Sequence, residues 1–356
     1  MEILIIKTAA IGDVLRTTVL LPALHRHFDK VTVTWITSPY AVPLLSCNPH
    51  ITHLYSITAG RCPEVEARRF DWVISLDEDE EASRVVASVR WRRLSGVFQD
   101  VEGARHYTSD MAEWFGMGLL RSPEEGGLVQ ANVLKRANTT SYPELLYKCL
   151  GLSLSVERPQ LILRPASVER MRQWMLDHCE ASSQDVIGVN SGAGARWRYK
   201  RLSEEKTADV ARSLAELSRA VILLLGGEDE AQRNARIERA CANRRIISGP
   251  SVPLEDFAAL IGCCDVVLSS DSLAMHIAIS LGIPVTAFFG PTSAAEIEVF
   301  NRGTKIETPL SCRTCYLANC DQVPNCMDAI ETTSLVSETL RAVKPRNVLT
   351  SSHYAS

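Results

Sequence analysis

The sequence has no long apolar run, no excess of basic residues, no low-complexity segment and no short-period repeat. None of its apolar stretches reaches the ~18 residues that a membrane-spanning helix needs. The 38 Lys and Arg residues are balanced by 42 Asp and Glu, which gives a formal net charge of −4. A nucleic-acid-binding domain would carry a basic patch, so we expect no nucleic-acid partner.

The sequence also lacks a recognisable signal peptide at its start. Met1–Lys7 holds an acidic residue at position 2, and its apolar stretch is too short for a secretory signal. We therefore expect a cytoplasmic protein, either free or held peripherally at the inner face of the membrane. Thiols stay reduced in the cytosol, so the eleven cysteines are not expected to form a disulfide scaffold.

Short β-branched runs alternate with amphipathic stretches along most of the chain, which is typical of α/β folds with parallel sheets. A chain of 356 residues is long enough for two domains, and the alternation restarts after an irregular stretch. The predicted strands are 3–6, 31–36, 72–76 and 94–98, then 186–189, 221–225, 245–247, 266–268 and 285–289. The predicted helices are 14–28, 40–46, 143–150, 204–217, 231–242, 254–263, 272–281 and 334–343.

The loop after the first predicted strand, Lys7–Asp13, is the first candidate site. Ligands of open α/β sheets bind outside the carboxyl ends of strands, and Gly12 permits a tight turn there. Asp13 is a candidate reactive carboxylate, with a plain helix N-cap as the alternative.

Three further loops follow strands of the second half. Residues 190–194 are small, include Ser191, Gly192 and Gly194, and precede basic residues that include Lys200. Such a loop suits an anion, although a solvated basic loop is the alternative. Glu228 follows Gly226–Gly227 and is a candidate partner for ribose hydroxyls, against a simple turn.

The fourth loop opens a predicted helix with Asp271 and Ser272, and His276 lies one turn further along. The free N–H groups at a helix start favour a phosphate. A structural role is the alternative for His276.

Taken in order, these segments resemble glycosyltransferase family nine, the bacterial heptosyltransferases. The resemblance rests on Lys7–Asp13, on Gly192–Gly194 leading to Lys200–Arg201, on Gly226–Glu228, and on Asp271–Thr292 with its Gly-x-Pro and Phe-Gly-Pro-Thr segments. It covers most of residues 1–300. Two departures are Leu273, where the family has Gly, and Leu202, where it has Trp. The acidic run 77–81 is a third, which we interpret as a solvated loop.

The resemblance implies a GT-B fold, in which two Rossmann-like domains face a central cleft, here with a Cys-rich segment and a C-terminal helix. It implies an N-terminal acceptor domain, 1–165, a C-terminal donor domain, 166–345, and a tail, 346–356. It also implies an inverting enzyme of lipopolysaccharide biosynthesis that transfers a sugar, with heptose from ADP-heptose expected, to lipopolysaccharide or another cell-envelope glycan or glycolipid. Asp13 would be the general base and Lys200 would stabilise the leaving group. Ser191, Gly192, Gly194, Lys200, Glu228, Asp271, Ser272 and His276 would bind the nucleotide-sugar donor, with no cofactor for catalysis.

Two alternatives remain at this level. A GT-B nucleotide-sugar epimerase would need no acceptor, and a non-catalytic nucleotide-sugar binder would explain Leu273 as a decayed donor site. The presence of Asp13, Lys200, Glu228 and His276 together argues against decay.

Four cysteines fall within fifteen residues: Cys312, Cys315, Cys320 and Cys326. Spacings this short are typical of tetrahedral thiolate sites. We predict a structural metal, zinc in preference to a single iron, with an iron–sulfur cluster or two disulfides as the alternatives.

Overall fold

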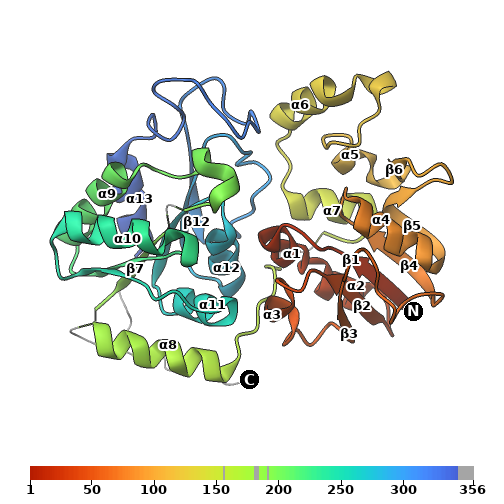
Figure 1. Ribbon diagram of the computed structural model, residues 1–356, viewed down its shortest axis with the longest axis horizontal. Coiled ribbons are helices and arrows are strands. Elements are labelled where there is room, and N and C mark those ends of the chain that lie inside the picture. The colour runs from red at the N-terminus through yellow and green to blue at the C-terminus, as the bar shows by residue number, and fades with distance from the viewer. Residues whose placement is uncertain (155–156, 180–183, 191, 344–356) are drawn as a thin grey trace.

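The computed structural model describes residues 1–154, 157–179, 184–190 and 192–343, and it has two α/β halves side by side (Figure 1). Each half contains one six-stranded sheet. The predicted α/β class with two Rossmann-like domains is confirmed. The boundary at residue 165 stays a prediction, and the tail, 346–356, lies outside the described residues.

The first sheet has the strand order β3-β2-β1-β4-β5-β6. All its neighbours pair in parallel except β6, which pairs antiparallel with β5 at one edge. The strands are β1 (Glu2–Ile6), β2 (Thr32–Thr37), β3 (His53–Ser56), β4 (Arg69–Ser75), β5 (Arg90–Gln99) and β6 (Arg105–Tyr107). The central strand β1 is buried over Ile3–Ile6 because helices cover both faces of the sheet.

The predicted helix 14–28 is in fact two helices, α1 (Ile11–Thr17) and α2 (Leu20–His27). Pro22 gives the physical reason, since a proline cannot donate a hydrogen bond to the carbonyl four residues earlier. The other helices of this half are α3 (Val42–Leu45), α4 (Glu80–Ser88), α5 (Ala112–Phe115), α6 (Gly127–Ala137) and α7 (Tyr142–Leu150). Short 3-10 turns lie at Ser109–Met111 and Pro123–Glu125.

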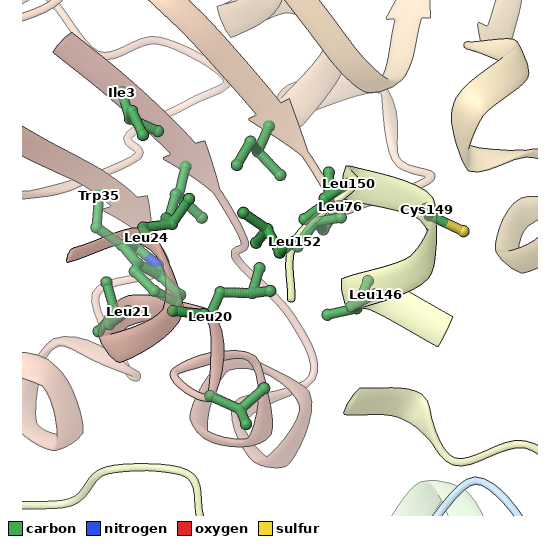
Figure 2. Close-up of a cluster of buried hydrophobic side chains, with 14 of the residues drawn as sticks. Ile3, Leu20, Leu21, Leu24, Trp35, Leu76, Leu146, Cys149, Leu150 and Leu152 are labelled. Carbon is green, nitrogen blue, oxygen red and sulfur yellow. The ribbon is translucent and has the colours of Figure 1, made fainter. Parts of the chain in front are cut away.

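One hydrophobic cluster joins α2 and α7 to the first sheet (Figure 2). Leu20, Leu21 and Leu24 of α2 pack there with Trp35 of β2, and Leu146 and Leu150 come from α7. The carboxyl end of β1 and the loop that follows it are therefore anchored on a packed core.

The second sheet has the order β12-β11-β10-β7-β8-β9, and every pairing is parallel. Its strands are β7 (Val186–Asn190), β8 (Val221–Leu224), β9 (Ile246–Ser248), β10 (Val266–Ser270), β11 (Val285–Phe289) and β12 (Gly303–Glu307). Its helices are α8 (Pro165–His178), α9 (Glu204–Leu217), α10 (Glu228–Cys241), α11 (Leu254–Gly262), α12 (Leu273–Leu281) and α13 (Thr332–Ala342), with a 3-10 segment at Ala195–Lys200.

The two halves meet where α1 lies against α12 (Figure 1). Leu15 of α1 and Leu44 of α3 belong to a buried cluster made mostly of residues from the second half. The helix that carries Asp13 is therefore packed directly on the helix that carries His276.

Candidate active site

A cleft of about 890 Å³ lies between the two halves. The loop after β1 and the start of α1 line one side, and the loops after β7, β8, β10 and β11 line the other. These loops follow the carboxyl ends of parallel strands, where α/β sheets bind ligands. Among the predicted site residues, the cleft brings together Asp13, Gly192, Gly194, Lys200, Asp271, Ser272 and His276.

Asp13 lies in the first turn of α1 and is not its cap. The N-cap is Ala10, and no side chain caps this helix. The Asp13 carboxylate instead lies 2.9 Å from the Arg16 guanidinium, with about a third of its side chain exposed. Burial opposes ionisation of Asp13, but the charges of Arg16 and Lys7 outweigh it and lower its pKa. The alternative of a plain N-cap is therefore wrong, and the side chain is a charged carboxylate open to the cleft.

Gly12 is required by the packing of α1 on α12. A Cβ atom at this position would come within 2.6 Å of the His276 ring. His276 is buried, and burial together with the nearby Arg16 charge lowers its pKa to about 4. The imidazole is therefore neutral near pH 7, beside the first turn of α1.

An ion pair on the opposite side of the cleft joins Lys200 to Asp271, with 2.8 Å between Nζ and Oδ2. His276 Nε2 lies 3.9 Å from the other carboxylate oxygen. Burial opposes ionisation of Asp271, but Lys200 and then His276 outweigh it and lower its pKa to about 2. Lys200 is thus held in place at the start of α12, close to the helix N-terminus.

The loop after β7 is fixed by side chains from β10 and the start of α12. Asn190 Nδ2 donates to Ser272 Oγ at 2.9 Å, and Ser270 Oγ donates to the Gly192 carbonyl at 3.0 Å. Ser272 is the N-cap of α12, as the sequence predicts for the helix start. The predicted residue Ser191 lies outside the described residues.

Glu228 does not line the cleft, contrary to our expectation. It is exposed at the start of α10, whereas Glu230 two residues later is buried and lines the cleft. The Glu230 carboxylate accepts hydrogen bonds from the Gly194 N–H at 3.3 Å and the Gly227 N–H at 3.1 Å. Glu230 therefore joins the two glycine loops. The sequence signal was present, because position 230 lies third in the helix and can bond back to its start.

A second cavity of about 510 Å³ adjoins the cleft on the side of the first sheet. Trp114, Phe115 and Lys135 line it, together with residues of the loop after β4. The two cavities share Ala10, Asp13, Arg16, Glu296 and Tyr316. Asp13 therefore lies where the cleft meets the second cavity, and it lines both.

Three of the boundary residues were not predicted: Arg16, Glu296 and Tyr316. The Arg16 guanidinium lies 3.9 Å from Glu296 Oε2 and also stacks on the Tyr142 ring at 3.9 Å. Burial raises the pKa of Glu296. Arg16 was within reach of sequence reasoning because it lies one helical turn after Asp13.

The structure gives roles to two of the departures from the family pattern, and one of them differs from the expected role. Residues 77–81 are not a solvated loop: Asp77 is buried and ion-paired with Lys7, and Asp79 caps α4 by accepting from the Ala82 N–H. Lys7 therefore supports the loop that leads into α1, the helix that carries Asp13. Leu202 is buried in the core of the second half, which explains an apolar residue there.

The four clustered cysteines lie in the segment between β12 and α13. Cys326 is buried, and burial, followed by the neighbouring thiols of Cys315, Cys320 and Cys312, raises its pKa to about 11. Within the described ranges, no group of three or more His, Cys, Asp or Glu side chains is arranged to hold a metal ion. The metal site stays a prediction.

Among the helices in the described part of the chain, none combines the length and apolar character of a membrane-spanning segment.

Residues 135–321, more than half of the chain, match the profile of glycosyltransferase family 9 (heptosyltransferase). Lipopolysaccharide heptosyltransferase 3 of Escherichia coli is 24% identical over 296 residues, which cover 79% of this chain and 81% of that protein.

Two solved structures share the whole architecture. The family 9 glycosyltransferase of Veillonella parvula has a TM-score of 0.73 at 15% identity and covers 96% of this chain and 97% of its own. The E. coli ADP-heptose LPS heptosyltransferase II has a TM-score of 0.67 at 16% identity, with 96% and 98% covered.

The profile spans the loops that build one side of the cleft, and the structural likeness extends over both sheets. The chain is a member of glycosyltransferase family 9, the heptosyltransferase family.

Proposed function

We propose that this enzyme is an inverting glycosyltransferase that moves heptose from ADP-heptose to lipopolysaccharide or another cell-envelope glycan. One observation carries the proposal: the Asp13 carboxylate and the Lys200–Asp271 pair at the start of α12 line the same cleft from opposite halves. The names of the relatives support the choice of sugar and acceptor. Membership of an enzyme family favours a transferase over a non-catalytic binder.

The second half supplies the donor side. Lys200, the N–H groups at the start of α12 and the loop containing Gly192 and Gly194 can neutralise a diphosphate. Val252, Leu254 and Phe257 line the cleft as an apolar surface for the base. We assign the donor to these residues.

The second cavity is the proposed acceptor side. It opens on Asp13 and is lined by both aromatic and charged side chains, a combination suited to a sugar with polar substituents. Leu273, where the family has Gly, also lines the cleft, so it limits the space beside the donor phosphates.

The transfer would proceed in one displacement. The acceptor hydroxyl oxygen attacks C1 of the heptose while its proton passes to Asp13, and the bond between C1 and the phosphate oxygen breaks. ADP leaves with the bonding electron pair, and Lys200 and the α12 start stabilise the added charge. The products are the inverted glycoside and ADP.

Lys200→Ala tests the donor assignment. ADP should raise the melting temperature of the unchanged protein, and Lys200→Ala should remove most of that shift. Lys206→Ala is a matched control, because the Lys206 ammonium donates to backbone carbonyls near Met327 and not to the cleft. If no nucleoside diphosphate raises the melting temperature, the donor assignment fails.

We also propose that Cys312, Cys315, Cys320 and Cys326 hold one structural zinc or iron ion. Four thiols within fifteen residues suit tetrahedral coordination, and three of them lie close enough to influence the pKa of Cys326. The thiols would have to converge further on binding. The metal would stabilise the segment and take no part in the transfer.

Elemental analysis tests this assignment. Protein purified without added metal should contain about one zinc or iron per chain, and Cys315→Ser should lower both metal content and stability. Cys47→Ser, at a scattered and partly exposed cysteine, should change neither. Metal-free protein with four titratable thiols would rule the site out.

The domain assignment at residues 1–165 and 166–345 is likewise proposed. Arg170 of α8 pairs with Asp256 of α11 at 2.6 Å, which supports placing α8 with the second half. Limited proteolysis should cut between α7 and α8, before residue 165, if the boundary is right.

A further inference from the structure

The Cys-rich segment places one aromatic side chain at the boundary between the two cavities. Tyr316 directly follows Cys315, and its ring lines both the cleft and the second cavity. Neither the metal proposal nor the transfer step uses this residue. Its position is nevertheless determined by several contacts, each from a different part of the chain.

The backbone around Tyr316 is tied to the loop after β11. The Tyr316 N–H donates to the Pro291 carbonyl at 2.8 Å, and the Thr314 N–H donates to the Gly290 carbonyl at 3.0 Å. Cys326 packs against the same loop, since a Cβ at Gly290 would come within 2.5 Å of its sulfur. Two parts of the Cys-rich segment, residues 314–316 and Cys326, therefore both contact the loop after β11.

The Tyr316 hydroxyl is used as both donor and acceptor. It donates to Glu296 Oε1 at 2.7 Å and accepts from the Ser293 N–H at 3.2 Å. The Lys135 ammonium lies 4.2 Å from the ring centroid, which adds a cation–π contact from α6. These contacts fix the ring from three sides.

Glu296 connects Tyr316 to Arg16 in the first half of the chain. Its other carboxylate oxygen lies 3.9 Å from Arg16, and Arg16 lies 2.9 Å from Asp13. Arg16 is thus held between two carboxylates, on a side chain that is only 14% exposed. If Glu296 turned away, Arg16 could pair with Asp13 alone and draw that carboxylate out of line with the acceptor cavity.

We propose that Tyr316 is a positioning residue that holds Glu296 against Arg16, so that the Cys-rich segment sets the orientation of Asp13 toward the acceptor. This proposal rests on the proposed function, because it requires Asp13 to act on the acceptor side. The Cys-rich segment would then influence the transfer step in addition to stabilising the fold.

Tyr316→Phe is the direct test, because it keeps the ring and removes only the hydroxyl. With ADP-heptose as donor and water as acceptor, we expect the kcat for ADP release to fall about ten-fold to a hundred-fold, the usual cost of a small misplacement. The KM for ADP-heptose, the affinity for ADP and the melting temperature should stay unchanged. Tyr40→Phe, at an exposed tyrosine outside both cavities, should have no effect on kcat.

A comparison of single and double variants tests whether Tyr316 affects turnover through Glu296 or independently of it. Glu296→Gln can still accept the Tyr316 hydrogen bond but loses its charge next to Arg16. If Tyr316 acts through Glu296, the double variant should be no slower than Glu296→Gln alone, since residues in one network do not add. Losses that simply multiply would overturn the proposal, as would an unchanged kcat in Tyr316→Phe.

The two proposals fail in distinguishable ways. If the unchanged enzyme neither binds ADP nor releases it from ADP-heptose, the proposed function fails. If that enzyme is active and Tyr316→Phe matches it, only the role of Tyr316 fails. Should Tyr316→Phe not fold, Glu296→Gln provides the same readout, and an unchanged kcat there overturns the chain from Glu296 to Asp13.

Discussion

The cleft and the second cavity meet at Asp13 but are built in different ways. Most of the cleft comes from short loops, each following one parallel strand and each containing small or charged residues close in sequence. The second cavity draws on elements that lie far apart along the chain, such as α5, α6 and the Cys-rich segment. The proposed donor site can thus be encoded locally, whereas the proposed acceptor side depends on how several elements pack.

This difference fits the chemistry of the two substrates. A diphosphate is bound by backbone N–H groups and helix starts, and these recur wherever a strand leads into a helix. An acceptor sugar is recognised by individual side chains placed around it. We therefore expect changes at the boundary residues to alter turnover, and changes in the loops of the second half to alter donor binding.

The largest effect is expected for Asp13→Asn, which removes the proposed base at the boundary. Turnover should fall about 10²-fold to 10⁴-fold, while ADP binding and melting temperature stay nearly unchanged. Asp209→Asn is a matched control, because Asp209 pairs with Arg212 in the same i,i+3 arrangement on the exposed face of α9. Full turnover by a folded Asp13→Asn protein would remove Asp13 from the mechanism.

The stability of the protein is expected to depend on pH through His276, which is buried where α1 packs on α12. The pKa of His276 is about 4 in the folded protein, against an ordinary value of 6.5. Between these values the unfolded chain binds a proton that the folded protein does not. Acidification from pH 6.5 toward pH 4 should therefore lower the free energy of unfolding by up to about 3 kcal/mol.

Urea unfolding at a series of pH values measures this loss. The His276→Gln variant should not show this acid-dependent loss of stability, whatever its overall stability. The His27→Gln variant, changed at an exposed site, should still show the loss. An equal acid dependence in all three proteins would contradict the assignment to His276.

Gly12→Ala should disturb both cavities by pushing α1 away from α12. The new Cβ would lie within 2.6 Å of the His276 ring, and overpacking of this kind costs about 1–3 kcal/mol. Gly262→Ala is the control, because its nearest neighbour is the end of the Leu163 side chain at 3.3 Å. Chemical denaturation of both variants checks the prediction, and equal stabilities would show that the contact can relax.

The smallest effect is expected on ADP affinity, where two glutamates of α10 should behave differently. Glu230→Gln weakens the bonds that Glu230 accepts from the Gly194 and Gly227 N–H groups. It should therefore reduce ADP affinity by about ten-fold. Glu228→Gln should leave the affinity unchanged because Glu228 is exposed outside the cleft. Calorimetric titration of ADP decides between them, and the reverse order would restore Glu228 as the ribose partner.

Many of the regular elements were predictable where burial imposed an apolar pattern on the sequence. The buried parallel strands β1, over Ile3–Ile6, and β8 are continuous apolar runs, and α9 was predicted at its observed bounds. Helices α4, α5, α6 and α8 and strands β3, β6 and β12 were missed. Leu128, Val129 and Val133 of α6 are exposed, so no apolar stripe is separated from a polar face. Strand β12 lies at a sheet edge, where three of its five residues are exposed.

The sequence by itself determined the fold class, the loops that follow the strands, and seven of the site residues that gather in the cleft. These depend on local order, because a strand end and the helix after it stay adjacent in any α/β fold. Only the tertiary structure decided that Glu230 also meets the loop at Gly194, and that Tyr316 contacts Glu296 while Glu296 lies beside Arg16. Those contacts join residues far apart in the chain, and no sequence period records them.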